Sequence, residues 1–236
     1  MKATRHLFSR LLTALLLSLA AAPVLTSCQA EDSENVNQDR IYTEYSLVYD
    51  RAEDKTYARA AFKFGNAAGT ALQLTGPATV TVDGDALAFV PLLNYYEKQY
   101  AGQRAQATFT YKDVAGTSFV NTVSGLLPAE FPASFTSLSK TSAYTLAWDG
   151  QPLRTPEILD VILDGPGQSD PLQYFQTTVP GATSLILEAN KISQVLSGEG
   201  KAFMNRTQIL PLQQGSSAGG SRIGRYQALP RTVQIQ

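Results

Sequence analysis

Histidine and cysteine are almost absent from this sequence, whose 236 residues include one of each, His6 and Cys28. A single cysteine excludes an intrachain disulfide and a cysteine-rich zinc site. His6 lies within the first 27 residues, which we expect to be cleaved off, so the mature chain would have no imidazole for acid–base chemistry or metal binding. The sequence therefore predicts a protein that is not an enzyme and that has no catalytic residues and no cofactor.

An excess of positive charge is also missing. Three of the 19 basic residues and none of the 20 acidic ones lie in the first 27 residues, which leaves 16 basic against 20 acidic residues in the remainder. A net charge of −4 lacks the basic surface that nucleic-acid binding requires and gives no electrostatic attraction to anionic lipid. We therefore expect no nucleic-acid partner. Hydrophobic residues make up 44% of the chain, which is enough for a buried core.

The N-terminus has the pattern of an export signal. Lys2, Arg5 and Arg10 precede an apolar run over 11–25 that is short for a membrane span, which needs about 20 apolar residues. The segment Leu25-Thr26-Ser27-Cys28 that follows resembles the lipobox of bacterial lipoprotein precursors. The resemblance implies a signal peptide over 1–27 and a lipidated Cys28, whose fatty acyl chains, palmitate among them, hold the protein at a membrane. The alternative is an ordinary secretory signal with a stray cysteine.

Residues 28–40 follow the signal as an acidic segment. Glu31, Asp32 and Glu34 come soon after Cys28 and resemble the signal that sends lipoproteins of Bacteroidota to the cell surface. The alternative is a charged, solvated tether, and only Ala30 and Val36 in 29–40 are apolar, which favours a flexible segment. We expect an outer-membrane lipoprotein of the cell envelope, exposed to the periplasm or at the cell surface.

From Ile41 onward, short alternating segments predict strands. Alternation in 41–49 places Ile41, Tyr45, Leu47 and Tyr49 on one face. Asp83-Gly84 lies between two such segments, 79–82 and 85–90, and this dipeptide favours a tight hairpin turn. A second hairpin is predicted from strands at 106–111 and 117–123. About seven strands at this spacing are typical of a β-sandwich.

The region over 126–132 lacks alternation and contains two prolines, which indicates a domain boundary. We expect one β-sandwich over 41–126 and a second over 127–236, with one short helical turn near 189–196. The strands expected in the second half are 131–138, 143–148, 156–163, 183–188, 201–212 and 226–235.

Several turn and core motifs carry a resemblance to a family. They are Ala-x-Phe-x-Phe-Gly at 60–65, Leu-x-Leu-x-Gly at 72–76, Val-x-Val-Asp-Gly at 80–84, Leu-Ala-Trp-Asp-Gly at 146–150, Val-Pro-Gly-Ala-Thr at 179–183 and the glycine-rich 219–226. Together they resemble lipoproteins of Bacteroidota built from two immunoglobulin-like β-sandwiches. The resemblance implies an all-β fold of two tandem immunoglobulin-like antiparallel β-sandwiches, and it transfers no functional residues.

Aromatic residues supply the candidate ligand-binding site. Tyr95, Tyr96 and Tyr100 cluster around charged residues, as aromatic platforms for sugar rings do, although alternation would place Tyr95 on the opposite side of a strand from the other two. Trp148 is a further candidate. The alternative for all four is a place in the core or at its edge.

Two other patterns have an alternative explanation, which for the first is simple turn chemistry. Asp160, Asp164 and Asp170 are a candidate calcium site, but their spacing differs from that of calcium loops and Asp-Gly-Pro-Gly favours a turn. Gly215 to Gly219 match the Gly-x-Ser-x-Gly pattern of hydrolases, which needs a histidine base that the mature chain would lack.

These observations favour a non-catalytic, membrane-anchored lipoprotein acting in binding, adhesion or assembly at the cell envelope, with a protein or glycan partner. The alternative is a carbohydrate-binding or carbohydrate-active surface protein. A structural subunit of a surface assembly is a third possibility, and it would show an exposed, unpaired edge strand.

Overall fold

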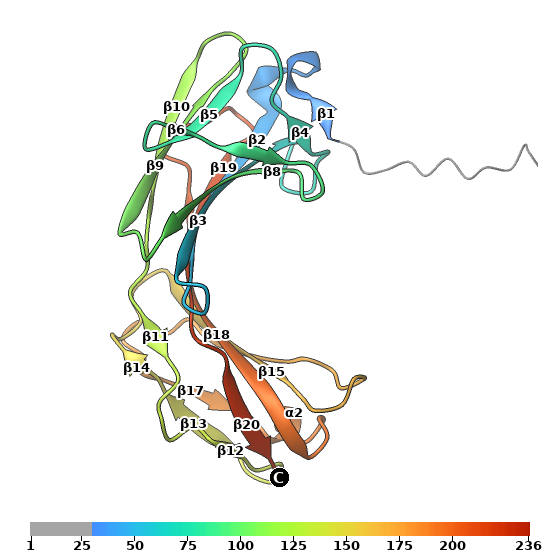
Figure 1. The fold of residues 1–236 in the computed structure, drawn as a ribbon, viewed down its shortest axis with the longest axis vertical. Coiled ribbons are helices and arrows are strands. Elements are labelled where there is room, and N and C mark those ends of the chain that lie inside the picture. Colours follow the sequence, from blue (N-terminus) through green and yellow to red (C-terminus); the bar gives the residue numbers. More distant parts are fainter. Residues whose placement is uncertain (1–29) are drawn as a thin grey trace, which may run out of the picture.

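A computed structural model describes residues 30–236, which form an all-β protein with a crescent outline (Figure 1). The prediction of an all-β fold built from packed antiparallel sheets is confirmed. The predicted signal peptide and Cys28 lie outside the described residues. The elements are β1 (Glu31–Asp32), η2 (Ser33–Asn35), η3 (Gln38–Arg40), β2 (Ile41–Asp50), β3 (Lys55–Phe64), β4 (Leu72–Gln73), β5 (Thr79–Val82), β6 (Asp85–Ala86), β7 (Ala88–Val90), β8 (Tyr95–Ala101), β9 (Gln106–Lys112), β10 (Ser118–Ser124), β11 (Ala129–Glu130), β12 (Ser137–Leu138), β13 (Tyr144–Ala147), β14 (Asp149–Gly150), β15 (Glu157–Asp164), β16 (Gln173–Thr177), β17 (Ser184–Leu187), α2 (Ala189–Ile192), β18 (Gly198–Pro211), β19 (Gly220–Gln227) and β20 (Arg231–Ile235).

One long sheet of ten strands runs through the whole crescent. Its strand order is β12-β20-β18-β19-β2-β3-β8-β7, and β15 pairs with β18 and in turn with β16. The pairing between β19 and β2 is parallel over eight residue pairs, from Gly220↔Thr43 to Gln227↔Asp50, whereas β18 is antiparallel to β15, β19 and β20. Strands from the two ends of the sequence are therefore neighbours in one sheet.

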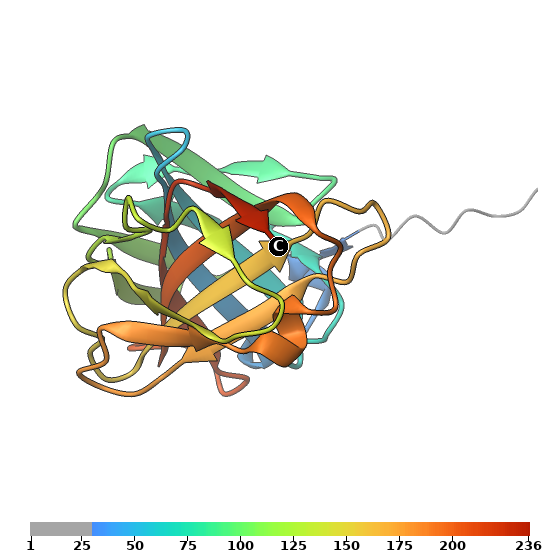
Figure 2. The ribbon, with the colours of Figure 1, turned by 90° about the horizontal axis from the view of Figure 1, so that it is seen from below.

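Strand β18 extends from the second half of the molecule into the first. Its early residues pair with β20 and its last seven pair with β19. Gly224 of β19 is needed where this strand passes β10, since a Cβ there would lie 2.5 Å from the carbonyl oxygen of Ser124. Seen along the long axis, the strands of the first half lie behind those of the second (Figure 2).

The long sheet covers two separate hydrophobic cores. A four-stranded sheet, β10-β9-β5-β6, closes the first core, which contains Tyr45, Phe62 and Phe109. The small sheets β13-β17 and β11-β14 lie on the second core, which contains Phe135, Trp148 and Phe175. The cores divide close to the predicted boundary at residue 126, while the long sheet continues across it. The assignment of separate domains to 41–126 and 127–236 stays a prediction.

Local sequence signals correctly predicted a hairpin turn, a strand and a helical turn. Asp83 and Gly84 both have positive φ, 49° and 88°, as a type I′ hairpin turn requires. The predicted alternation of β2 is confirmed, because Ile41, Tyr45 and Leu47 are all buried. The helical turn predicted near 189–196 is present as α2, over Ala189–Ile192.

Three expectations are corrected. Within the expected tether, residues from Glu31 onward are docked, because β1 pairs with β4 and the Ser33 hydroxyl accepts a hydrogen bond from the Thr75 amide. The polar composition of 29–40 did not predict this contact, because polar groups of this segment form hydrogen bonds with the rest of the protein instead of with water. In 131–138 only Ser137–Leu138 is a strand. The third concerns Gly219-Gly220-Ser221, whose glycines favour a flexible loop: residues from Gly220 onward form β19 (Gly220–Gln227), because the neighbouring strands in the sheet supply the hydrogen bonds.

A buried ion pair lies under the region where the two halves meet. Arg206 of β18 is fully buried, and its Nε donates to Glu157 of β15 at 3.1 Å. Its Nη2 also donates to Glu157 at 2.5 Å, and the two terminal nitrogens donate to the carbonyl oxygens of Gln151 and Pro152 at 3.0 and 2.9 Å. Glu157 also accepts from the Arg154 amide at 2.8 Å. The pair is hydrogen-bonded on both sides, which offsets the cost of removing two charges from water.

We predict that Glu157→Gln lowers the free energy of unfolding by about 3 kcal/mol, because it leaves a buried arginine without its counter-charge. Denaturant unfolding measures the change. The matched control is Glu199→Gln on β18, which is exposed and should change stability by less than about 0.5 kcal/mol. Equal effects of the two variants would contradict the role given to the pair.

Candidate binding face

The face of the long sheet that points away from both cores forms the concave side of the crescent (Figure 1). No second layer of strands from residues 30–236 packs on it, as is common for one face of an antiparallel sheet. Neighbouring side chains on the face nevertheless bury Val48, Thr207 and Asp160. We call it the open face. It is formed by Glu44, Ser46 and Val48 of β2, Tyr57, Arg59 and Ala61 of β3, Tyr95 and Glu97 of β8, Ile223 and Arg225 of β19, Asn205, Thr207 and Ile209 of β18, and Ile158 and Asp160 of β15.

Arg59 organises the half of the open face formed by β3 and β8. Its Nε donates to Glu97 at 2.7 Å, and its guanidinium carbon lies 4.7 Å from the Tyr57 ring centroid and 5.1 Å from that of Tyr95. Burial acts to raise the pKa of Glu97, but hydrogen bonds from Gln99 and Arg59 outweigh it and hold that pKa below its usual value. Charge and ring stacking together fix the orientation of Tyr95 on this face.

A shallow pocket of about 260 Å³ lies beside this group, with Arg225 on its opposite side. Arg225 Nε donates to the Thr207 hydroxyl at 3.2 Å. Among residues 30–236 its two terminal nitrogens have no hydrogen-bond acceptor, so they remain able to bind a carboxylate or another acceptor. The complete lining is Glu44, Ser46, Val48, Arg59, Ala61, Tyr95, Ile223 and Arg225.

Polar side chains continue the open face onto the second half. Asp160 of β15 accepts a hydrogen bond from Asn205 at 2.8 Å, and Gln227 lies 3.4 Å from the Asn205 oxygen. Burial raises the pKa of Asp160, against the opposing effects of the Asn205 hydrogen bond and the positive charge of Arg225. The open face thus carries aromatic rings, apolar side chains and charges of both signs.

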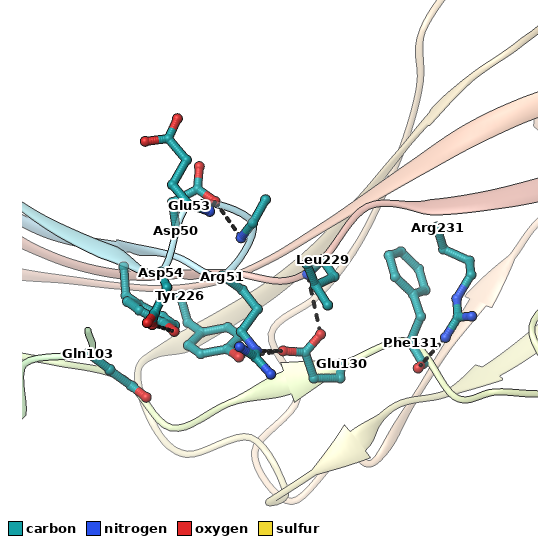
Figure 3. A network of polar contacts seen from close by, with 12 residues as sticks. Asp50, Arg51, Glu53, Asp54, Gln103, Glu130, Phe131, Tyr226, Leu229 and Arg231 are labelled. Carbon is teal, nitrogen blue, oxygen red and sulfur yellow. Dashed lines mark hydrogen bonds and ion pairs between the residues drawn. The ribbon is translucent and has the colours of Figure 1, made fainter. Parts of the chain in front are cut away.

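A polar network holds the two halves together behind this face (Figure 3). Glu130 of β11 accepts from the Tyr226 hydroxyl and, at 3.3 Å, from the Leu229 amide, and it lies 3.7 Å from Arg51. Desolvation, followed by the hydrogen bond to Glu130, raises the pKa of Tyr226. Tyr49 packs on the Tyr226 ring at 5.4 Å and donates to Asp54 at 2.7 Å. The β2–β3 turn is therefore tied to β11 and β19, and the network has a structural role.

The candidate tyrosines do not share one surface. Tyr95 lies on the open face, whereas the Tyr96 ring is buried against Phe62 and Phe89, and its hydroxyl accepts from the Leu74 amide at 2.6 Å. Tyr100 lies on the core side of β8, where Arg104 covers its ring at 4.1 Å. The alternation of a strand separates them, so the three tyrosines cannot form a single platform.

Trp148, the remaining aromatic candidate, is a core residue. Its side chain is 5% exposed within the second core, and its Nε1 lies 3.3 Å from the Gln151 carbonyl oxygen.

The three aspartates of the calcium alternative are not gathered around one point. Asp160 and Asp164 lie four residues apart along β15, and Asp170 instead accepts from the amides of Gly167 and Leu196, each at 3.0 Å. Within residues 30–236 no cluster of three acidic, histidine or cysteine side chains has the geometry of a metal site.

The Gly-x-Ser-x-Gly segment is a loop that anchors to the start of β2. Ser216 donates to the Ile41 carbonyl oxygen at 2.7 Å, and the Ser217 hydroxyl contacts Asp39. A strand, β19, follows the segment, whereas a nucleophile elbow requires a helix there.

At two sheet edges, side chains form hydrogen bonds with backbone groups that have no neighbouring strand to pair with. The amides of Val120 and Thr122 in β10 donate to the side chains of Gln214 and Gln213, at 2.8 and 2.6 Å. On β16, the Tyr174 carbonyl oxygen accepts from Lys191 at 2.8 Å. Such contacts oppose the addition of a further strand at these places.

Sequence reasoning missed Arg225, Ile223, Ser46 and Arg59 as members of a common site. The alternation predicted for 41–49 already placed Ser46 on the side opposite the core. The alternation did not predict that β19 pairs in parallel with β2, which places Arg225 in the same pocket lining as Ser46 and Arg59.

No protein-family model and no curated protein matches the chain. One solved structure that it resembles is described as "Structural insight into host cell surface retention of a 1.5-MDa bacterial ice-binding adhesin". The identity is 12% and the TM-score is 0.23, with 83% of this chain and 65% of that chain covered. The chain thus spans less than two thirds of that structure, and a TM-score this low assigns neither fold nor role. No helix in residues 30–236 is both long and apolar enough to cross a bilayer.

We predict a pH-dependent effect of Asp160→Asn. A carboxyl whose pKa is raised on folding binds its proton more tightly in the folded state, so its ionisation destabilises the fold. The free-energy cost of ionising Asp160 is absent at pH values below the pKa of this carboxyl in the unfolded chain. It is fully present at pH values above the pKa of the same carboxyl in the folded protein. The stability of the variant relative to the wild type should therefore increase as the pH rises through this window. Urea unfolding between pH 3 and pH 8 measures it.

The control for removal of one surface charge is Asp149→Asn, since Asp149 is exposed on β14. A relative stability of Asp160→Asn that falls with rising pH would show that the ionised carboxylate is favoured in the folded protein.

Proposed function

We propose that this protein is a non-catalytic lipoprotein of the bacterial cell envelope, anchored in the outer membrane through Cys28, that binds a partner in adhesion or assembly through its open face. The observation that carries the proposal is the uncovered face of the long sheet. It continues across both cores and presents Tyr95, Arg59, Arg225 and Ile223 together.

The chemistry of the open face suits recognition. Arg59 already has Glu97 as its partner, whereas the terminal nitrogens of Arg225 are available to an acceptor. Ile209 is 50% exposed and lies directly across from Ile223, which adds apolar area beside the charges. A binding surface commonly has aromatic and arginine side chains at its centre and polar groups around them.

The lipoprotein part of the proposal is supported by the order of basic, apolar and lipobox residues in 1–28. The resemblance to Bacteroidota lipoproteins with two immunoglobulin-like β-sandwiches agrees with an all-β body. Intact-mass analysis of the native protein should find an N-terminal Cys28 carrying fatty acyl chains. An unprocessed N-terminus would contradict the anchor.

Site-specific photo-crosslinking in cells tests the open face. A photoreactive residue replacing Ile209 should give a crosslinked partner, whereas one replacing Val120, which is 39% exposed on the outer side of β10, should not. Arg225→Ala should reduce the adduct about tenfold, as expected from loss of a charge-assisted hydrogen bond. Arg104→Ala, which removes an arginine next to Asp83 away from the open face, is the control. Equal adducts from positions 209 and 120 would refute binding through this face.

Carbohydrate binding is the alternative, and the pocket beside Tyr95 favours it. A partly exposed tyrosine next to Ser46, Glu44 and Arg225 could stack on a sugar ring while the polar groups bind its hydroxyls. A glycan array followed by calorimetry should then yield a ligand whose binding is lost in Tyr95→Ala and retained in Tyr100→Ala, because Tyr100 lies on the other side of β8. Binding that both variants retain would exclude this pocket.

A further inference from the structure

The turn between β7 and β8 carries an exposed pair of leucines. Leu92 is 90% exposed, more than any other large hydrophobic residue in 30–236, and Leu93 is 57% exposed. The Val90 carbonyl oxygen accepts hydrogen bonds from the amides of Leu93 and Asn94, at 3.1 and 2.9 Å. The turn is therefore fixed by its own backbone, and its two apolar side chains are held out in solvent, at a cost that an apolar partner would relieve.

This turn lies at the same end of the molecule as the start of the described chain. The segment 72–74 links them, because Leu72 pairs with Glu31 of β1 and the Leu74 amide donates to the Tyr96 hydroxyl on β8 at 2.6 Å. In Figure 1, β1 and β4 lie side by side at the end of the molecule that also carries β8. The turn is therefore at the same end of the molecule as Glu31, the first residue of β1.

The length of chain outside the structure limits how far this end can be from a membrane. Cys28 precedes Glu31 by three residues, which span at most about 10 Å when fully extended. Since Glu31 is already hydrogen-bonded to Ala71 at 2.9 Å, little slack remains between the lipidated residue and the folded body. An acylated Cys28 would thus hold the β1–β4 end against the bilayer surface.

We propose that Leu92 and Leu93 insert into the lipid surface beside the acylated N-terminus, so that this end of the first half rests on the membrane and the second half points away from it. The inference rests on the proposed lipidation of Cys28. The nearby acidic residues Glu31, Asp32 and Glu34 give no attraction to anionic lipid, so the contact is apolar and insensitive to salt.

Fluorescence quenching by brominated phosphatidylcholine tests this in vesicles that hold the full mature lipoprotein. Leu92→Trp places a tryptophan in the turn, and Leu172→Trp places one at a similarly open site, 64% exposed, in the second half. Because Trp148 is buried, it adds the same background to both variants. Leu92→Trp should be quenched severalfold more than Leu172→Trp, to the same extent at low and high salt.

Equal quenching of the two variants, or none in either, overturns the insertion. Intact mass of the same samples separates the two proposals. Acylated protein without selective quenching refutes only the insertion, whereas protein without acyl chains refutes the anchor and, with it, the insertion. Circular dichroism identical to wild type shows that neither substitution disturbs the fold.

Discussion

The parallel pairing of β19 with β2 is the constraint on which the rest of the structure depends. It joins a strand near the C-terminus to the first long strand of the chain through eight residue pairs. Because β18 pairs with β19 as well as with β15 and β20, the two halves become parts of one sheet. The open face exists only through this arrangement, since Arg225 comes from β19 while Ser46 and Arg59 come from β2 and β3.

Two polar groupings, one buried and one partly exposed, support this shared sheet from the core side. Arg206 and Glu157 connect β18 to β15 beneath it, and Glu130 connects β11 to Tyr226 and the β2–β3 turn. Both groupings are hydrogen-bonded to backbone as well as to side chains, so their geometry is specific in a way that apolar packing alone is not. The side chains on the opposite, open face are therefore presented on a rigid support, which is favourable for recognition.

The proposed anchor at one end and the open face along the concave side would give the two parts of the molecule different roles. The docking of Glu31 on β4 leaves little chain between Cys28 and the body, so a lipidated N-terminus would set the orientation of the protein as well as its location. The open face continues along the sheet from the first half to Asp160 and Ile158 in the second. A partner could then contact residues from both halves at once.

The sequence by itself determined the all-β class, the Asp83-Gly84 hairpin turn and the alternation of β2, because each of these depends on residues adjacent in the chain. It also predicted that Tyr95 and Tyr96 would point to opposite sides of a strand. Only the tertiary structure decided that the glycine-rich 220–227 is a strand, that the polar 31–40 is docked, and that Arg225 lines the same pocket as Arg59. The hydrogen bonds responsible link residues far apart in the sequence, as between Ser33 and Thr75, and local patterns contain no record of such partners.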